Sequence, residues 1–152
     1  MNAVAPSVSL RLATSADHAE LIQVWDAAVR ATHHFLAEED ILFFHSSVPS
    51  ALAQLNVWIA EDAARIVGFI AVSGKHIEAL FIAPDQHRRG IGRRLLDHIV
   101  ATHPGTYWNV DVNEQNPEAT RFYLHSGFIQ TGRSELDPSG RPYPLLHLVL
   151  RR

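Results

Sequence analysis

The segment formed by residues 77–96 constrains the fold more than any other part of this sequence. It begins with an apolar run suited to a β-strand, which Pro84 ends because proline cannot donate a hydrogen bond to a neighbouring strand. A short polar turn with Gly90 and Gly92 follows, and apolar residues then recur at the spacing of a helix. The segment therefore predicts a strand, a glycine-containing turn and the N-terminus of a helix, in that order.

A turn of this kind can bind a phosphate group. Glycines let the backbone approach the anion closely, and the free amides and the dipole of the helix N-terminus attract its charge. Four arginines with phosphate-binding guanidinium groups flank the turn, namely Arg88, Arg89, Arg93 and Arg94. Two glycines are also common in purely structural turns, and Leu95 stands where a dinucleotide-binding fingerprint has its third glycine. The local pattern leaves both interpretations open.

Residues 80–96 resemble motif A of the GNAT N-acetyltransferase superfamily. That motif reads Gln/Arg-x-x-Gly-x-Gly/Ala and holds the pyrophosphate of acetyl-CoA. In this sequence its glycine positions are Gly90 and Gly92, and its Gln/Arg position is His87, where the family's contacts are mostly made by the main chain. The resemblance implies that the turn binds acetyl-CoA.

A second block, residues 116–128, resembles motif B of the same superfamily and lies about thirty residues after the first. Its pattern contains Asn116, Ala119, Tyr123, Gly127 and Phe128. Residues 31–33 and 140–146 also look like the YjaB group of small bacterial acetyltransferases. The resemblance covers the whole chain and implies a single GNAT acetyltransferase domain over residues 1–152.

The resemblance implies how acetyl-CoA binds. The backbone of Leu80, Phe81 and Ile82 would pair with the pantetheine arm like an added strand, and Asn116 would bond the amide region of the cofactor. The main chain of the turn would hold the pyrophosphate. The expected cofactor-binding residues are Leu80, Phe81, Ile82, His87, Arg88, Arg89, Gly90, Ile91, Gly92, Arg93, Asn116 and Tyr123.

Tyr123 is the expected general acid. The resemblance implies that its hydroxyl lies near the sulfur and protonates the leaving thiolate. A phenol has a reference pKa near 10 and is therefore able to donate a proton at pH 7. The alternative is a structural tyrosine at the edge of the core.

The acceptor amine arrives as an ammonium ion and must lose a proton, which calls for a general base or water. Glu78 is the first candidate, with His76 and Asp111 behind it. Regular strand alternation would give one face His76, Glu78, Leu80 and Ile82, and the other face Ile77, Ala79 and Phe81. Glu78 would then share a face with the cofactor-binding segment, although it could also be a solvated carboxylate.

The expected acceptor-binding residues come from three parts of the chain. They are His33, Phe35, Asp111, Asn113 and Tyr143. The aromatic and histidine-rich stretch over residues 32–47 has two interpretations, a second helix that packs its phenylalanines or a lining of the acceptor site. Polar residues on the strand over 106–112 would line the acceptor side, or they would simply face solvent.

The composition limits the other possibilities. The 152 residues suggest one domain, and the absence of cysteine excludes an acyl-cysteine intermediate and a thiolate metal site. A net charge of −3 argues against nucleic acid as a partner. No metal is expected, because no H-x-x-x-H spacing occurs. Without a signal-like or membrane-spanning apolar run, we expect a cytoplasmic protein, not bound to membranes, that is a monomer or homodimer.

Hydrophobic periodicity and turn residues predict the order β-α-α-β-β-β-α-β-α-β-β. The expected fold is α/β, with a mixed, mostly antiparallel central sheet and helices on both faces. Strands are expected over 8–12, 57–60, 66–73, 106–112, 128–133 and 145–150, and helices from Thr14, over 90–102 and over 116–127.

The expected function is direct transfer of acetyl from acetyl-CoA to a primary amine in a ternary complex. The acceptor could be a small molecule, a lysine or a protein N-terminus. The alternative is a catalytically silent domain that senses acetyl-CoA or mediates an interaction.

Overall fold

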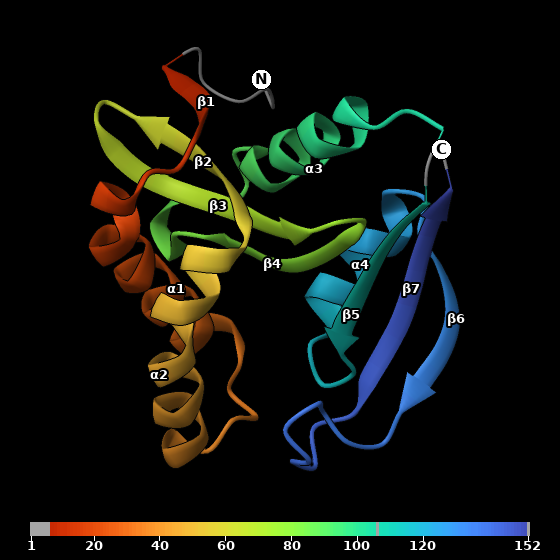
Figure 1. Cartoon of the computed structure of the whole chain (residues 1–152). Helices are drawn as coiled ribbons and strands as arrows, with labels where there is room; N and C mark the ends of the chain where they lie inside the picture. Colours follow the sequence, from red (N-terminus) through yellow and green to blue (C-terminus); the bar gives the residue numbers. More distant parts are fainter. Residues whose placement is uncertain (1–6, 106, 152) are drawn as a thin grey trace.

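The computed structural model describes residues 7–105 and 107–151 and contains a seven-stranded sheet in the order β1-β2-β3-β4-β5-β7-β6 (Figure 1). Only β4 and β5 pair in parallel. The strands are β1 (Val8–Leu12), β2 (Asn56–Asp62), β3 (Arg65–Ser73), β4 (His76–Ile82), β5 (Tyr107–Asn113), β6 (Ile129–Ser134) and β7 (Leu145–Arg151). The helices are α1 (His18–Thr32), α2 (Glu38–Gln54), α3 (Ile91–Thr102) and α4 (Pro117–His125). The predicted element order and mixed α/β sheet are confirmed; Thr106, predicted to start a strand, lies outside the described residues.

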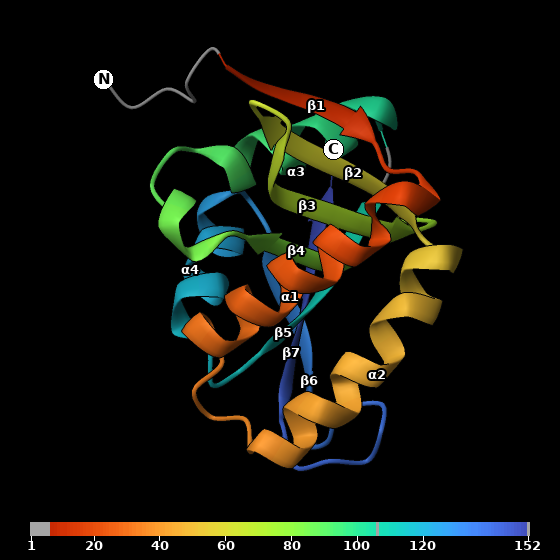
Figure 2. The same cartoon turned by 90° about the vertical axis from the view of Figure 1, so that its left-hand side faces the viewer.

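Helices cover both faces of the sheet, as predicted. Helices α1 and α2 pack on one face of β2–β4, around Leu21, Ile59 and Phe69 (Figure 2). Helices α3 and α4 pack on the other face, where Leu95 and Trp108 are fully buried. The alternation on β5 is confirmed, since its buried and exposed residues follow one another along the strand.

Strands β4 and β5 separate along their length. They pair only through His76 with Asn109 and Ile77 with Val110, and Figure 1 shows the two halves of the sheet diverging beyond that point. The edge of β4 that faces β5 is therefore unpaired after Ile77. This opening is the position at which a ligand could add to β4 as an extra strand.

Strand β4 contains a β-bulge at Glu78. Consecutive residues of β3 pair with Ala79 and Ile77, so Glu78 has no partner there. Ile77 consequently packs in the same core as Leu80. The predicted alternation, which placed Ile77 with Ala79 and Phe81, is wrong because one extra residue reverses the facing of the strand.

Helix α2 differs from the helix considered over residues 32–47. It occupies Glu38–Gln54 and begins with three acidic residues, which the helix dipole stabilises at an N-terminus. Residues 33–37 form the connection from α1 instead. The expected packing of the phenylalanines is only partly correct, since Phe44 is half-buried but Phe43 is 42% exposed.

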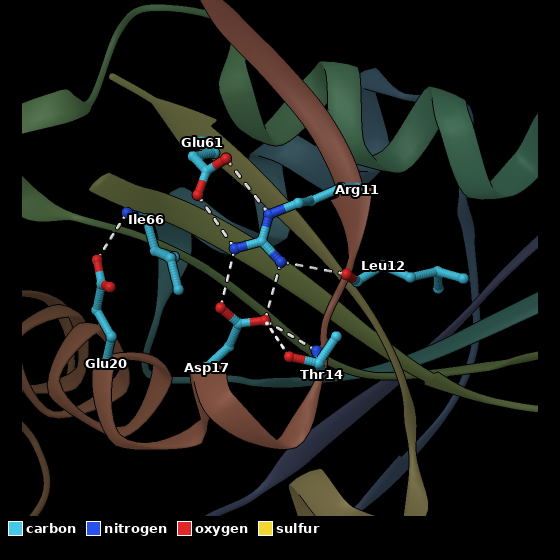
Figure 3. A network of polar contacts seen from close by, with 7 residues as sticks. All are labelled: Arg11, Leu12, Thr14, Asp17, Glu20, Glu61 and Ile66. Carbon is cyan, nitrogen blue, oxygen red and sulfur yellow. Dashed lines mark hydrogen bonds and ion pairs between the residues drawn. The ribbon is translucent and has the colours of Figure 1, made fainter. Parts of the chain in front are cut away.

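An arginine joins the first strand to its neighbours. Arg11 contacts the carboxylates of Asp17 and Glu61, with Nη2 distances of 2.9 and 3.1 Å (Figure 3). The Arg11 guanidinium and the N–H of Thr14 hold the pKa of Asp17 well below its usual range. Thr14 and Asp17 form a reciprocal capping interaction at the start of the helical segment predicted from Thr14, and this segment is thereby tied to β1 and β2.

The turn between β2 and β3 has an unusual sequence for its conformation. Ala63 and Ala64 both have positive φ, at 50° and 67°, in a two-residue hairpin loop. Such a loop favours Asn-Gly, because the left-handed region is strained for a residue with a Cβ.

We expect Ala64→Gly to raise the free energy of unfolding by about 1 kcal/mol, because relief of this strain exceeds the added freedom of the unfolded chain. Urea denaturation measures the change. Ala27→Gly, in the exposed middle of α1, is the matched control and should lower stability by about 1 kcal/mol. Equal losses in both variants would contradict the assignment of strain to Ala64.

Candidate active site

The first of two neighbouring pockets lies in the opening between β4 and β5 and has a volume of about 310 Å³. Its walls come from β4, the second half of β5 and the N-terminal part of α4, and His87 and Gly92 lie at one end. Tyr123 and Asn116, from the second sequence motif, face the same space. The two motifs that resemble those of acetyltransferases therefore meet across one cleft.

The second pocket, of about 430 Å³, lies on the other side of β4, between α1, α2 and the β6–β7 connection. Its wall is mostly apolar and includes Trp25, Leu52 and Phe69. An apolar pocket with a few polar groups at one end is a typical small-molecule or side-chain site.

Five residues line both pockets and mark the border where the two spaces meet. They are His33, Glu78, Ala79, Phe81 and Asn113. The bulge in β4 places Glu78 at this border. Three polar side chains from α1, β4 and β5 thus converge where two substrates could come into contact.

Tyr123 is buried at the wall of the first pocket. Its ring packs against Phe122 and Phe128 at 5.1 and 5.3 Å between centroids, and burial raises its pKa above the usual value. Its hydroxyl forms no hydrogen bond with any residue in 7–105 or 107–151, although it is not sealed from the pocket. The hydroxyl is therefore a protonated donor without a competing partner in the described chain.

The turn before α3 has the features expected of an anion site. Gly90 is the N-cap with φ 73°, and Arg88 also has a positive φ of 69°. The amides of Ile91, Gly92 and Arg93 donate to no other described residue, whereas the next amide bonds to the carbonyl of Gly90. Successive free amides at a helix N-terminus suit a pyrophosphate group, so the residues fit acetyl-CoA.

Three of the four arginine side chains that flank the turn have partners within the chain. Arg89 binds Asp62, Arg93 binds Asp97, and Arg94 donates to the carbonyl of Val8. Of the four, Arg88 is the one with no side-chain partner among the described residues. The contacts of Arg88, Arg89 and Arg93 with the cofactor stay predictions.

Two other predicted cofactor contacts already have partners. The Oδ1 atom of Asn116 accepts a hydrogen bond from the amide of Ala119 at 3.2 Å and caps α4, which leaves its NH₂ group available to a ligand. The imidazole of His87 lies 3.3 Å from the carbonyl oxygen of Ile82. That carbonyl belongs to the segment expected to pair with pantetheine, and its second lone pair is available to a ligand.

The candidate bases lie in a row of polar groups. His76 Nε2 is 3.8 Å from a carboxylate oxygen of Glu78 and 3.8 Å from one of Asp111. Asp111 accepts from His147 Nδ1 at 2.6 Å, and His147 Nε2 is 2.6 Å from Ser134 Oγ. His76 lines neither pocket and Asp111 lines only the first, so Glu78 has the best position of the three.

The predicted acceptor residues are brought together only in part. His33 and Asn113 line both pockets, and Tyr143 lines the second. The Tyr143 hydroxyl is engaged by Asp40 and by the amide of Ala37, so it supplies a wall and not a free polar group. Phe35 lines neither pocket; it packs against His33 and Tyr143 from behind. The structure thus does not bring Phe35 to the wall of either pocket, and its predicted contact with substrate stays a prediction.

The sequence interpretation missed several residues that line the two pockets, among them two close to His33 and Tyr123. Phe122 lines the first pocket beside Tyr123, and Thr32 lines it beside His33. Each is adjacent to a residue that was singled out, but only the helix geometry shows that the neighbour also faces the pocket. Apolar and hydroxyl side chains of this kind carry no chemical signal of their own.

Burial, and to a smaller extent the neighbouring His34, lowers the pKa of His33 from 6.5 to about 4. The unfolded chain therefore binds more protons than the folded chain between pH 6.5 and 4. As the pH is lowered from 6.5 to 4, we expect this residue to decrease the free energy of unfolding by up to about 1.4 kcal/mol per pH unit. Urea titrations should show a shallower pH dependence for His33→Gln than for wild type. Identical slopes would contradict the buried neutral state, and His34→Gln is the exposed control.

Comparison with known proteins identifies the family of the chain. The family model described as an acetyltransferase (GNAT) domain matches residues 32–140. The chain belongs to the GNAT family and is an acetyl-CoA-dependent N-acetyltransferase. None of the described helices is both long and apolar enough to span a membrane. Within the described ranges, no group of three or more His, Asp or Glu side chains could hold a metal ion.

Two similar proteins are named peptidyl-lysine N-acetyltransferase YjaB. The protein of Salmonella typhimurium is 40% identical over 93% of this chain and 97% of its own length. That of Escherichia coli is 42% identical over 93% of this chain and 96% of its own length. The solution structure of apo-form YjaB from Escherichia coli has a TM-score of 0.85 at 40% identity, covering 93% of this chain and 96% of that one.

Proposed function

We propose that this enzyme transfers the acetyl group of acetyl-CoA to the ε-amino group of lysine residues in proteins or peptides. The observation that carries the proposal is that two pockets meet at Glu78, His33 and Asn113. Tyr123 lines the first of these pockets. The first pocket accounts for the cofactor and the second for the acceptor. The names of the two YjaB relatives support lysine among the possible amines.

The first pocket fits the thioester arm. The unpaired edge of β4 between Glu78 and Ile82 can bond the pantetheine amides, and the free amides from Ile91 to Arg93 can bind the pyrophosphate. This arrangement would direct the thioester toward the border of the two pockets. Tyr123 would then lie beside the sulfur.

The second pocket fits a lysine side chain. The aliphatic stem of lysine can lie along apolar residues while its nitrogen reaches a polar end. Glu78 would take the proton from the ammonium ion, and the neutral amine would attack the carbonyl carbon. Tyr123 would donate to the thiolate as the carbon–sulfur bond breaks, so that acetyl-lysine and coenzyme A leave with one net proton released.

A peptide panel tests this proposal. Peptides with one lysine and a blocked N-terminus are incubated with acetyl-CoA, beside matched peptides with arginine and a free N-terminus, and beside small amines. Thiol release gives the rate and mass spectrometry locates the acetyl group. Acetylation confined to lysine supports the proposal; acetylation confined to N-termini or small amines contradicts it.

We expect Glu78→Gln to lower kcat/KM for a lysine acceptor by about tenfold or more, mainly at low pH, where little free amine exists. The measurement is a pH–rate profile. Glu118→Gln is the control, because Glu118 lines only the cofactor pocket. An unchanged profile for Glu78→Gln would transfer the role to His76, Asp111 or water.

The silent acetyl-CoA sensor is not favoured, because the relatives are named as enzymes. We also propose that residues 1–152 act as one domain, since one sheet includes strands from both ends of the described chain. The expected cytoplasmic location and the monomeric or homodimeric state stay predictions. Light scattering of the purified protein would test the latter.

A further inference from the structure

His33 ends α1 at the border of the two pockets. Its amide donates to the carbonyl of Val29 at 2.7 Å, which fixes the backbone. Its ring lies between those of Phe35 and Phe81, with centroid distances of 5.3 and 6.0 Å. The imidazole is therefore held by the backbone and by two aromatic contacts, and it lines both pockets.

Thr32 fixes the tautomer of His33. The Thr32 hydroxyl donates to the carbonyl of Ala28 at 2.7 Å, and its oxygen lies 2.8 Å from His33 Nδ1. A hydroxyl has one proton, and the carbonyl can only accept it. In the arrangement in which Thr32 donates to the Ala28 carbonyl, the Thr32 oxygen accepts from Nδ1–H, the proton of the neutral imidazole is on Nδ1, and Nε2 carries a lone pair.

This lone pair is accessible from the site. His33 Nε2 has no hydrogen-bond partner among the described residues. Unlike the unpaired nitrogens His98 Nε2 and Trp108 Nε1, which are fully buried, it is not enclosed by the protein. Since the ring lines both pockets, Nε2 is an open hydrogen-bond acceptor at their border.

We propose that His33 orients the acceptor amine, through a hydrogen bond from the nitrogen of lysine to His33 Nε2, and that Thr32 positions His33 by fixing its tautomer. This inference rests on the proposed lysine acetylation. It identifies the His33 imidazole as the group that orients the attacking lysine nitrogen. The ammonium ion R–NH₃⁺ first gives one proton to Glu78. Of the two remaining N–H bonds, one donates to Nε2, which directs the nitrogen lone pair at the thioester carbon.

The later steps leave His33 unchanged. As the carbon–nitrogen bond forms, the nitrogen becomes positive and releases its second proton to solvent. The carbon–sulfur bond breaks and the thiolate takes a proton from Tyr123, which solvent replaces. His33 thus holds an N–H bond throughout and accepts no net proton.

The surroundings of His33 favour a neutral imidazole, which accepts a hydrogen bond, over a protonated one. Glu78 faces His33 from β4, His34 follows it in the chain, and the Tyr143 hydroxyl is engaged by Asp40. Burial lowers the pKa of His33 to about 4, so the ring stays neutral at pH 7. A neutral imidazole does not repel an incoming ammonium ion.

The chain contains an internal control for this arrangement. At the end of α3, Thr102 donates to the carbonyl of Ile99, and its oxygen lies 2.9 Å from His103 Nδ1. That threonine–histidine pair lines neither pocket. A substitution of Thr102 therefore shows how the loss of a threonine–histidine contact affects stability, without a change at either pocket.

The kinetic test compares five variants with wild type on one lysine peptide. We expect His33→Phe, which keeps an aromatic ring, to lower kcat/KM by about 10–100-fold, and His33→Gln, which keeps an acceptor, to lower it less. Thr32→Val should cost severalfold and Thr32→Ser should restore the rate. Thr102→Val should change neither the rate nor the Kd of acetyl-CoA. Measuring that Kd for the His33 and Thr32 variants separates an effect on the cofactor, whose pocket both residues also line, from an effect on the acceptor.

A spectroscopic readout accompanies the kinetics. Long-range ¹H–¹⁵N spectra of histidine-labelled protein distinguish Nδ1–H from Nε2–H, and His33→Gln assigns the signal. We expect the Nδ1–H tautomer in wild type and its loss in Thr32→Val. An Nε2–H tautomer in wild type, or equal activity of His33→Phe and wild type, would overturn the role of His33. A wild-type protein that modifies no lysine peptide would instead overturn the proposed function on which it rests.

Discussion

Tyr123→Phe is expected to lower kcat by roughly 10–10³-fold while the affinity for acetyl-CoA remains near that of wild type. The thiolate of coenzyme A must be protonated as it leaves, and general acid catalysis typically contributes about 10²–10⁴-fold. Water can replace part of this effect, which sets the lower limit. The substitution removes one oxygen atom and retains the ring that packs between Phe122 and Phe128.

The structure favours a chemical role for this hydroxyl. Burial raises the pKa of Tyr123, so the proton is present throughout the pH range of the assay. The hydroxyl has no hydrogen-bond partner elsewhere in the described chain, so its removal leaves no buried group unpaired. Tyr107→Phe, on an exposed tyrosine outside both pockets, is the control. A Tyr123→Phe protein that keeps its turnover but loses stability would make Tyr123 structural.

Gly92→Leu is expected to change stability and binding in opposite directions. Leucine favours a helix over glycine by roughly 0.7 kcal/mol, and a Cβ at Gly92 would meet Phe122 and Ile82 at ordinary distances of 3.7 and 3.8 Å. The free protein should therefore have an equal or higher Tm. Gly92, Phe122 and Ile82 all line the first pocket, so a leucine side chain should obstruct the approach of acetyl-CoA, whereas the motif itself admits alanine at this position.

We expect the Kd for acetyl-CoA to rise at least about tenfold in Gly92→Leu, with a correspondingly smaller increase in Tm on addition of the cofactor. Calorimetry and thermal-shift titration measure the two effects. Gly92→Ala, which the motif admits, should bind acetyl-CoA nearly as well as wild type, and Gly132→Ala, in β6 and outside both pockets, is a second control for affinity. Wild-type affinity in Gly92→Leu would remove the phosphate site from this turn. Gly90 is a weaker test because its φ of 73° would also strain any substituted residue.

Much of the fold was predictable from local patterns. Glycine and proline marked the ends of α3 and α4, and alternation identified β5 and its buried residues. The start of α2 was not predictable from its aromatic residues, and the helix continues through Pro49. The bulge at Glu78 was also not predictable, because it depends on pairing with β3 and not on the residues of β4 alone.

The candidate site was predictable where the chemistry lies in a motif. Tyr123 and Asn116 line the cofactor pocket, as expected from the second block. The ion pairs of the arginines were not predictable, since a guanidinium near a turn binds a phosphate or a carboxylate equally well. The partner of Arg89 is Asp62, which is distant in sequence. Thr32 was missed because its effect on His33 requires the carbonyl of Ala28, one helical turn earlier.

The central claim is that acetyl-CoA and a lysine side chain meet at the border of the two pockets. A conjugate in which the ε-nitrogen of a lysine peptide is joined through an acetyl bridge to the sulfur of coenzyme A would occupy both pockets at once. Its Kd, measured by calorimetry, should be about 100-fold or more below that of coenzyme A, and Gly92→Leu should weaken its binding. A conjugate that binds no more tightly than coenzyme A itself would contradict the account.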